Sequence, residues 1–407
     1  MFSVRPKHTS GLAIALSLCL IADHKAEAAN FTFTNIADPS GSLRGFGITA
    51  PAINASGTVA FRASLDGGGE GIFSGDGSEL TTIADTNGRL RNPFSQFGFS
   101  PDIDDTGKVA FESFLRSGVS GIFVGDGDTP VDPLTPLVDN SGFLNALGDP
   151  DLNNAGTVSF IANFDALVAN GIFTTDGNST TSIVDSQGAF ALFGSSPAIN
   201  ETGTVAFVGK LGNGSSTDGI FTSTNGLLTT VVDTSGPFKG FGFGFEPAIN
   251  DDGTLAFFAQ RDTGEFGIFS HDNGVVTTLA DTNSLFSSFG VPAINNDGTI
   301  AFFARLDTGS EGIFVGSDPL RDRVIAEGDS LFGSTVADLN PFSFSRKALN
   351  DTGQTAFFAK LEDGREVIVR ADPIREKVPE ASPIAGLLSF GSLCTGICLK
   401  RQQQPRH

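Results

Sequence analysis

The stretch Pro-Ala-Ile-Asn-Glu-Thr-Gly-Thr-Val-Ala-Phe at Pro197–Phe207 decides the fold, because it recurs along the whole chain. Its clearest other copies are Pro247–Phe257 and Pro292–Phe302. The asparagine position occurs seven times, at successive spacings of 50, 49, 47, 50, 45 and 55 residues, as Asn54, Asp104, Asn153, Asn200, Asn250, Asn295 and Asn350. A period in this range is typical of solenoids, propellers and other arrays, in which each unit completes its core only by stacking on its neighbours.

The repeat that begins at Pro247 contains four short strand-like segments separated by turn residues. Its first apolar segment is followed by Asp251-Asp252-Gly253, a turn of the kind that joins antiparallel strands. Three β-rich segments come next, at Thr254–Gln260, Phe266–Ser270 and Val275–Leu279. Four strands and four turns in one repeat are the content of one propeller blade.

The two ends of the repeat region are out of phase. The seventh repeat starts at Pro341 and stops at Asp372 after only three strands. The missing fourth strand is found at the start, where Phe31–Asp38 matches segments such as Thr277–Asp281. Pairing the two ends would close a ring and hide the edge strands that an open sheet exposes. We therefore predict an all-β fold over residues 29–372: a seven-bladed β-propeller of four-stranded antiparallel blades, the last blade closed by the N-terminal strand.

The repeat resembles the NxxGxxAF tandem repeat of bacterial exported surface proteins, and it is also similar to the Pro-Ala-Trp-Ser-Pro-Asp-Gly repeats of TolB-type propellers. The resemblance covers nearly all of Ala29–Asp372 and implies architecture and export, with no assigned activity. The repeats depart from the pattern at Asp104 and Lys108 in the second copy, Ser159 in the third and Gln354 in the seventh. None of these departures changes the predicted fold.

The N-terminus has the features of a secretory signal peptide. Arg5 and Lys7 precede the apolar run Gly11–Ala22, and Ala26-Glu27-Ala28 follows as a small-residue cleavage site. We expect a signal peptide over residues 1–28, cleaved between Ala28 and Ala29.

The C-terminus has the features of a sorting signal. A linker at residues 373–378 leads to the pair Pro379-Glu380, the apolar Pro383–Leu399 and the basic Lys400-Arg401. This order resembles the PEP-CTERM signal, although Ala381 stands where that family usually has a second proline. The resemblance implies processing by an exosortase-type enzyme and an association with extracellular polysaccharide. We therefore expect a PEP-CTERM-like sorting and transmembrane segment over residues 379–401, followed by a cytoplasmic tail at 402–407. The protein would then be exported, at the cell surface or extracellular, and transiently anchored by this segment. The alternative, a plain C-terminal membrane anchor, predicts the same location outside the cell.

The composition narrows the range of partners. A formal charge of −21 argues against nucleic acid and anionic lipid, because both need a basic footprint. There are 39 Phe but no Tyr or Trp, so we expect most rings to pack in the core, although Phe241, Phe243 and Phe245 could form an exposed patch. The three cysteines lie in the terminal segments, which leaves the body without a disulfide framework.

Two repeated sets of polar residues are candidate sites. The repeated Asn and Gly fit turn chemistry, which explains them without a ligand. A second set of acids ends each fourth strand and could together hold Ca²⁺, which prefers six to eight oxygen ligands; alternatively, each acid caps its own loop at the outer rim. The acids of this set are Asp38, Asp85, Asp139, Asp185, Asp233, Asp281 and Glu327.

Few residues of the body suit catalysis. Its one histidine, His271, falls in a predicted turn, and its lack of Cys and Tyr removes thiol and tyrosine nucleophiles. A Ca²⁺-dependent hydrolase of lactones, esters or phosphoesters and a paired-carboxylate glycosidase remain open on residue types. We expect a non-catalytic exported propeller that needs no cofactor and binds polysaccharide or another surface protein; a purely structural matrix protein is a further alternative.

Overall fold

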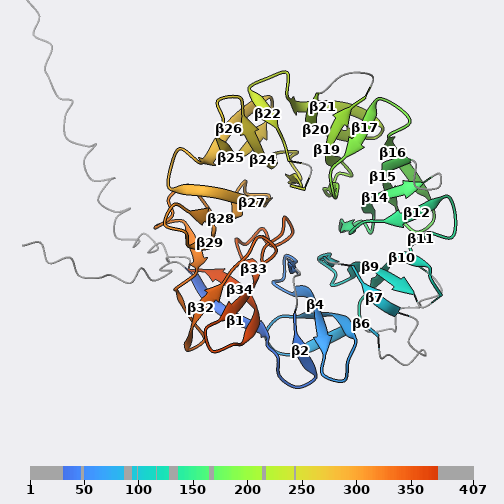
Figure 1. The fold of residues 1–407 in the computed structure, drawn as a ribbon. Helices are drawn as coiled ribbons and strands as arrows, with labels where there is room; N and C mark the ends of the chain where they lie inside the picture. Colours follow the sequence, from blue (N-terminus) through green and yellow to red (C-terminus); the bar gives the residue numbers. More distant parts are fainter. Residues whose placement is uncertain are drawn as a thin grey trace, which may run out of the picture.

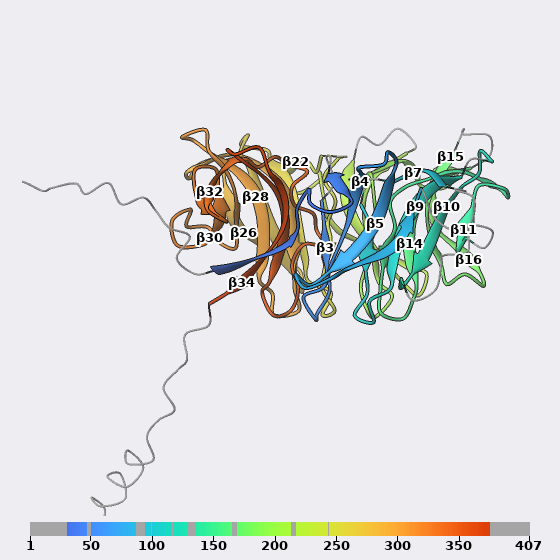
Figure 2. The ribbon, with the colours of Figure 1, turned by 90° about the horizontal axis from the view of Figure 1, so that it is seen from below.

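A computed structural model describes residues 31–46, 50–86, 94–98, 100–115, 117–127, 136–164, 169–212, 217–242 and 244–374, with the backbone alone for 94–97. In these residues the secondary structure consists of strands, gathered into seven sheets. The sheets stand around a central axis and form a disc, seen face-on in Figure 1 and edge-on in Figure 2. The predicted seven-bladed β-propeller is confirmed.

The strands of blades 1 to 3 are β2 (Leu43–Gly45), β3 (Ala52–Ile53), β4 (Val59–Leu65), β5 (Glu70–Gly75) and β6 (Leu80–Asp85); β7 (Phe94–Phe97), β8 (Asp102–Ile103), β9 (Val109–Leu115), β10 (Ser120–Gly125) and β11 (Val138–Asp139); and β12 (Leu144–Leu147), β13 (Asp151–Leu152), β14 (Val158–Phe164), β15 (Ala169–Thr175) and β16 (Thr180–Asp185). Those of blades 4 and 5 are β17 (Phe190–Phe193), β18 (Ala198–Ile199), β19 (Val205–Leu211), β20 (Asp218–Thr224) and β21 (Leu227–Asp233); and β22 (Phe238–Gly240), β23 (Ala248–Ile249), β24 (Leu255–Arg261), β25 (Phe266–Asp272) and β26 (Val275–Asp281). Those of blades 6 and 7 are β27 (Phe286–Ile294), β28 (Ile300–Leu306), β29 (Glu311–Phe314) and β30 (Arg323–Ala326); and β31 (Ser330–Leu331), β32 (Ser334–Asp338), β33 (Thr355–Leu361), β34 (Glu366–Pro373) and β1 (Phe31–Ala37).

In blades 1 to 5 the innermost strand is interrupted near the axis. In blade 4, for example, β17 and β18 both pair with β19, and the four-residue gap between them holds Pro197. Proline cannot donate a ladder hydrogen bond, so it suits this unpaired inner edge. In blade 6 the two pieces join into the single strand β27, with a register shift between Phe289 and Pro292.

The N-terminal strand closes the ring, as the sequence predicts. β1 pairs antiparallel with β34, from Phe31 opposite Pro373 to Ala37 opposite Ile368. Figure 1 shows β1 and β34 side by side in this blade. The ring of Phe33 lies 6.3 Å from that of Phe357 in an edge-on contact, which ties the added strand into the core of the last blade.

The repeated Ala-Phe pair builds the centre of each blade. Phe207 in β19 lies directly opposite Phe221 in β20, with ring centroids 5.8 Å apart. The corresponding pairs in five other blades are Phe61–Phe73, Phe111–Phe123, Phe160–Phe173, Phe257–Phe269 and Phe302–Phe314. Such cross-strand aromatic pairs stabilise a sheet beyond the area they bury. In the last blade Phe357 faces Val369 instead.

Neighbouring blades share one core, which explains why the phenylalanines are so numerous. Val208 and Ile220 of blade 4 pack with Phe238, Phe241 and Phe257 of blade 5. Phe241 is therefore a core residue, and Phe245 stacks on Phe258 at 4.1 Å, whereas Phe243 lies outside the described residues. Each buried ring contributes about 1.5–3 kcal/mol relative to an exposed one, so packing accounts for most of the Phe-rich composition.

Within the described residues there is no helix long and apolar enough to cross a membrane. The expected signal peptide with its cleavage site at Ala28 and Ala29, the pair Pro379-Glu380 and the apolar segment after it lie outside the described residues. The corresponding domain boundaries stay predictions.

Candidate functional site

Each repeat turn is organised by its asparagine. In blade 4, Oδ1 of Asn200 accepts hydrogen bonds from the backbone N–H of Thr204, at 2.9 Å, and from the hydroxyl of Thr202, at 2.8 Å. Gly203 closes the turn with a φ of 78°, a value that favours glycine. This is the turn chemistry that the sequence predicts. We call the side of the disc that carries the seven turns the turn face.

The other half of each asparagine side chain links the blades, which the sequence does not predict. Nδ2 of Asn200 donates to the backbone carbonyl of Asn250 in the next blade, at 2.9 Å. The link crosses the chain ends as well, because Asn350 donates to Asn54 at 2.9 Å. Six of the seven positions make this bond, at 2.9–3.2 Å, and together they form a belt around the axis. The exception is Asp104, which has no amide to donate.

A second belt lies one residue further along each turn. The backbone N–H of each of these residues, except Asp351, donates to the side chain of its counterpart in the next blade, at 2.7–3.0 Å. These seven residues are Ala55, Asp105, Asn154, Glu201, Asp251, Asn296 and Asp351. The belt stops at Ala55, which has no acceptor to offer to Asp351. It holds four carboxylates and two amides at fixed positions on the turn face.

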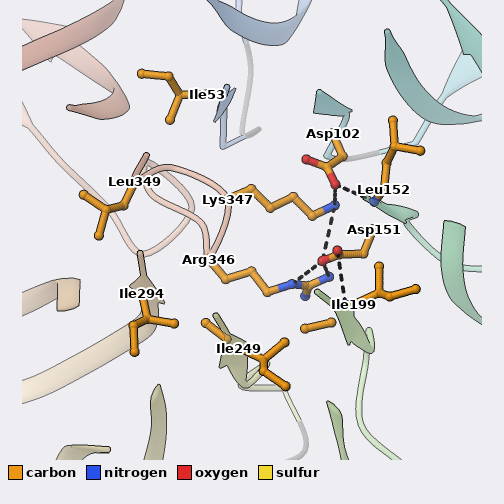
Figure 3. A pocket seen from close by; sticks show the side chains of 12 residues that line it. Ile53, Asp102, Asp151, Leu152, Ile199, Ile249, Ile294, Arg346, Lys347 and Leu349 are labelled. Carbon is orange, nitrogen blue, oxygen red and sulfur yellow. Dashed lines mark hydrogen bonds and ion pairs between the residues drawn. The ribbon is translucent and has the colours of Figure 1, made fainter. Parts of the chain in front are cut away.

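The two belts surround a cavity of about 250 Å³, the turn-face cavity. Its inner end is a ring of seven aliphatic side chains, Ile53, Ile103, Leu152, Ile199, Ile249, Ile294 and Leu349. Six of these side chains also line a second cavity of about 140 Å³, so the aliphatic ring lies between the two cavities. We call the second one the inner cavity (Figure 3).

The seventh repeat supplies the positive charges of the inner cavity. The chain between its two inner strands is longer than that of blade 6. In blade 6, Phe286 pairs with Leu306 across these strands, and the two residues are 20 positions apart (306 − 286). The equivalent pair in blade 7, Val336 and Leu361, is 25 positions apart (361 − 336). The additional chain between β32 and Leu349 reaches the axis, and Figure 3 shows Arg346 and Lys347 extending from it toward blades 2 and 3.

Arg346 joins blades 3, 4, 5 and 7. Its Nε donates to Asp151 at 2.8 Å, Nη2 donates to the carbonyl of Pro197 at 2.7 Å, and Nη1 pairs with Glu246. The side chain is only 3% exposed. Burial alone would lower the pKa of Arg346, but Glu246 and Asp151 raise it above its ordinary value. The guanidinium is therefore a fixed charge held by its neighbours.

Lys347 makes the corresponding contacts to blades 2 and 3. Its Nζ lies 3.4 Å from Oδ2 of Asp102 and donates to the carbonyl of Pro150. Oδ2 of Asp102 also accepts the backbone N–H of Leu152, at 2.6 Å, and Oδ1 accepts that of Ile103, at 2.8 Å. Burial raises the pKa of Asp102, and Lys347 opposes that rise. The charges of the inner cavity thus neutralise one another across the axis.

A further pair of acids, Glu112 and Asp149, lies between blades 2 and 3. Glu112 in β9 is buried, and burial together with the charge of Asp149 raises its pKa to about 8. A Cβ placed on Gly98 would lie 2.9 Å from Oδ1 of Asp149 and 3.1 Å from Oε2 of Glu112, so both side chains reach the space left by this glycine. Glu112 holds a proton at neutral pH and could donate it.

The structure does not bring the acids of the fourth strands together. Asp85, Asp139, Asp185, Asp233 and Asp281 end β6, β11, β16, β21 and β26, whereas Asp38 and Glu327 follow β1 and β30. Asp139, Asp185, Asp233 and Asp281 each accept a backbone N–H two residues on, at 2.9–3.0 Å. Among the described residues, no three His, Cys, Asp or Glu side chains lie together as a metal site would require. A Ca²⁺ site formed by these seven acids stays a prediction.

His271 is not in a turn, contrary to the sequence prediction. β25 continues to Asp272, and His271 pairs with Leu255 on one side and Val276 on the other. The turn is shorter than expected because Asn273 and Gly274 both adopt positive φ, which allows a two-residue hairpin.

Comparison with known proteins gives a family and confirms the fold. A model described as "Family of unknown function (DUF7453)" matches residues 17–267 and 135–372. The chain belongs to this family. No curated protein sequence matches it.

Two solved structures share the fold of this DUF7453 chain. One is a puromycin-hydrolyzing peptidase of Mycobacterium tuberculosis, with a TM-score of 0.51 and 16% identity over 86% of this chain and 57% of that one. The other is an oligogalacturonate lyase of Vibrio parahaemolyticus, with a TM-score of 0.51 and 10% identity over 84% of this chain and 97% of that one. This chain therefore spans little more than half of the peptidase. At these identities the likeness shows the fold alone.

The charged residues of the inner cavity were missed by sequence reasoning, although the repeats of this DUF7453 chain contain a signal for them. Five repeats have alanine two positions before the belt residue, whereas the second and third have Asp102 and Asp151. The seventh has Lys347 in place of the usual proline, preceded by Arg346. A charge that replaces an apolar repeat residue costs energy when buried unless it is paired, so such departures indicate partners across the axis.

Proposed function

We propose that this chain is a non-catalytic exported propeller, displayed at the cell surface or in the extracellular matrix, that binds polysaccharide at its turn face. The observation that carries the proposal is the turn-face cavity, with carboxylates and amides fixed around it by blade-to-blade hydrogen bonds. Carboxylate and amide groups bind sugar hydroxyls, and a rigid frame lowers the entropic cost of binding.

The inner cavity supports a structural role for the remaining central charges. Asp102 and Asp151 accept hydrogen bonds from backbone N–H groups and face Lys347 and Arg346. Catalytic acids and bases need to exchange protons with a substrate, whereas these carboxylates serve as partners of buried cations. In this proposal the ion pairs of the inner cavity hold the blades together, and the polar turn face binds the ligand.

The test is binding of the purified full chain to a panel of immobilised glycans, followed by calorimetry with the best oligosaccharide. Replacing Glu201 and Asp251 by Ala is expected to weaken binding by at least tenfold, because hydrogen bonds to charged groups contribute about 1.5–3 kcal/mol each. Arg365→Ala, in the outer Asp363–Arg365 pair, is the control and is expected to bind like the parent. A panel with no bound glycan would contradict the proposal, and a surface protein captured instead would support the alternative.

Export is a separate part of the proposal and has its own test. Mass spectrometry of the protein recovered outside the cell is expected to show an N-terminus at Ala29 and a C-terminus near Pro379-Glu380. An intact Met1 on a protein that stays in the cytoplasm would contradict it.

A second candidate function, hydrolysis, is favoured by Glu112 and Asp149. A carboxyl group that keeps its proton at neutral pH is what a general acid requires. Turnover of 4-nitrophenyl glycosides, esters, lactones and phosphoesters, measured with and without a chelator, tests this candidate. Turnover that is lost in Glu112→Gln would support it, and no turnover of any substrate would exclude it.

A further inference from the structure

The ion pair between Lys347 and Asp102 is almost closed off from solvent. Nζ of Lys347 lies 3.4 Å from Oδ2 of Asp102, and the two side chains are 10% and 8% exposed. Oδ2 of Asp151 lies 4.0 Å from the same nitrogen, so that the amine stands between two carboxylates (Figure 3). An amine and a carboxyl group held this close are the two halves of an amide bond.

The surroundings of the pair favour its uncharged form. The inner cavity is lined mostly by aliphatic side chains, among them Leu152 and Leu349. In such surroundings a proton moves more readily from an ammonium to a carboxylate, because both groups then lose their charge. Burial raises the pKa of Asp102, as does the charge of Asp151, whereas Lys347 opposes the rise. In the uncharged form the lysine offers a free amine and Asp102 a neutral carboxyl group.

Both oxygens of Asp102 accept hydrogen bonds from the backbone. The N–H of Ile103 donates to Oδ1 at 2.8 Å, and the N–H of Leu152 donates to Oδ2 at 2.6 Å. These bonds fix the position of Cγ, the atom that an attacking amine must reach. Attack on Cγ moves negative charge onto the oxygens, and N–H groups aimed at them stabilise that charge as the donors of an oxyanion hole do.

Asp151 is placed to take up a proton during the reaction. Its Oδ2 forms an ion pair with Arg346, with Nε at 2.8 Å and Nη2 at 2.6 Å. A carboxylate near an attacking amine can act as a general base and then return the proton to the leaving group. The inner cavity, at about 140 Å³, has room for the water molecule that is released.

We propose that Lys347 and Asp102 are joined by an intramolecular amide bond. Nζ attacks Cγ of Asp102 with its lone pair, and Asp151 takes a proton from the nitrogen. The C–O bond to the hydroxyl of the carboxyl group breaks, and the hydroxyl leaves with that proton as water, so nothing is oxidised or reduced. The two residues are 245 positions apart (347 − 102). The bond ties blade 7 to blade 2 across the axis and holds the disc together whatever its turn face binds.

The experiment is mass spectrometry of a tryptic digest of the purified full chain. We expect one branched peptide, residues 92–108 joined to residues 347–360, with a mass one water below the sum of the two. Cleavage after Lys347 is lost, because trypsin requires the free side chain. The same digest contains a matched control: Lys210 and Asp218 form an ion pair at 3.7 Å whose side chains are 39% and 20% exposed. This pair is expected to stay unlinked, with normal cleavage after Lys210.

Two variants test the chemistry. Lys347→Arg keeps the charge but cannot form the bond, and it is expected to migrate more slowly than the parent in a denaturing gel, since the parent keeps a closed loop when it unfolds. Asp151→Asn removes the base and is expected to leave most of the chain unlinked, because a general base contributes about 10²–10⁴ in rate. If a variant fails to fold, the digest of the parent still decides.

The outcomes that would overturn the inference are distinct. Cleavage after Lys347 in the parent, with both peptides at full mass, would show an ordinary ion pair. Loss of water at an aspartate other than Asp102 would place the reaction elsewhere. A link at Lys210 as well would show that the bond arises during preparation. Linkage of Asp151→Asn as complete as that of the parent would overturn the role given to Asp151.

Discussion

Replacing Arg346 by Met should destabilise the whole ring, because this side chain connects four blades at its centre. The substitution keeps most of the volume and removes the charge. Among the described residues, Asp151, whose side chain is 9% exposed, then keeps only the N–H of Ile199 at 3.3 Å and the more distant Lys347 at 4.0 Å. It also leaves the carbonyl of Pro197 without its donor. Breaking one side of a buried ion pair costs about 3–5 kcal/mol, because the remaining charge stays buried.

The expected change in melting temperature follows from the size of the domain. Residues 31–374 number 344 (374 − 30), and at about 2.1 cal/mol/K per residue the entropy of unfolding is about 0.7 kcal/mol/K. A loss of 3–5 kcal/mol therefore lowers the melting temperature by about 4–7 °C. Calorimetric melting and urea unfolding of the parent and variant measure this change.

Two further variants test the cause. Arg321→Met removes an 87% exposed arginine that pairs with Asp318 at 3.7 Å, and it should cost less than about 1 kcal/mol. The double variant Asp151→Ala, Arg346→Met removes both buried charges and should recover most of the loss, since Glu246 is partly exposed and can be hydrated. The reasoning is refuted if Arg346→Met costs no more than Arg321→Met, or if the double variant is no more stable than the single one.

Three other predictions concern the pH dependence of stability, the closure of the ring by β1 and the belt of asparagines. Glu112→Gln should match the parent in free energy of unfolding below pH 4.5 and exceed it by a growing amount as the pH rises through about 8, by at most about 4–5 kcal/mol. The reason is that a group with a raised carboxyl pKa stabilises the fold only while it is protonated. Urea unfolding between pH 4 and 9 measures this difference between variant and parent, and a difference that does not change with pH would contradict the prediction. Deleting residues 31–37 should expose the edge of β34 and give aggregates by light scattering, and a synthetic Phe31–Asp38 peptide should restore the monomer. Asn250→Ala removes the bond to Asn295 at 3.2 Å and the bond from Thr254 at 2.8 Å and should cost about 2–4 kcal/mol in urea unfolding, whereas a loss below 1 kcal/mol would mean that the belt contributes little.

The fold could be predicted because the information for it is local and repeated. The turn at Asn250 and Gly253 and the strands after it determine one blade, and seven copies with out-of-phase ends determine closure. Contacts across the axis are different in kind. Arg346 and Asp151 are 195 residues apart in sequence, and the repeat period says which blade each belongs to but not which side chains meet at the centre. The replacement of alanine by Asp102 and Asp151, and of proline by Lys347, is a sequence signal for charges at the axis, but it does not say which of these side chains pair.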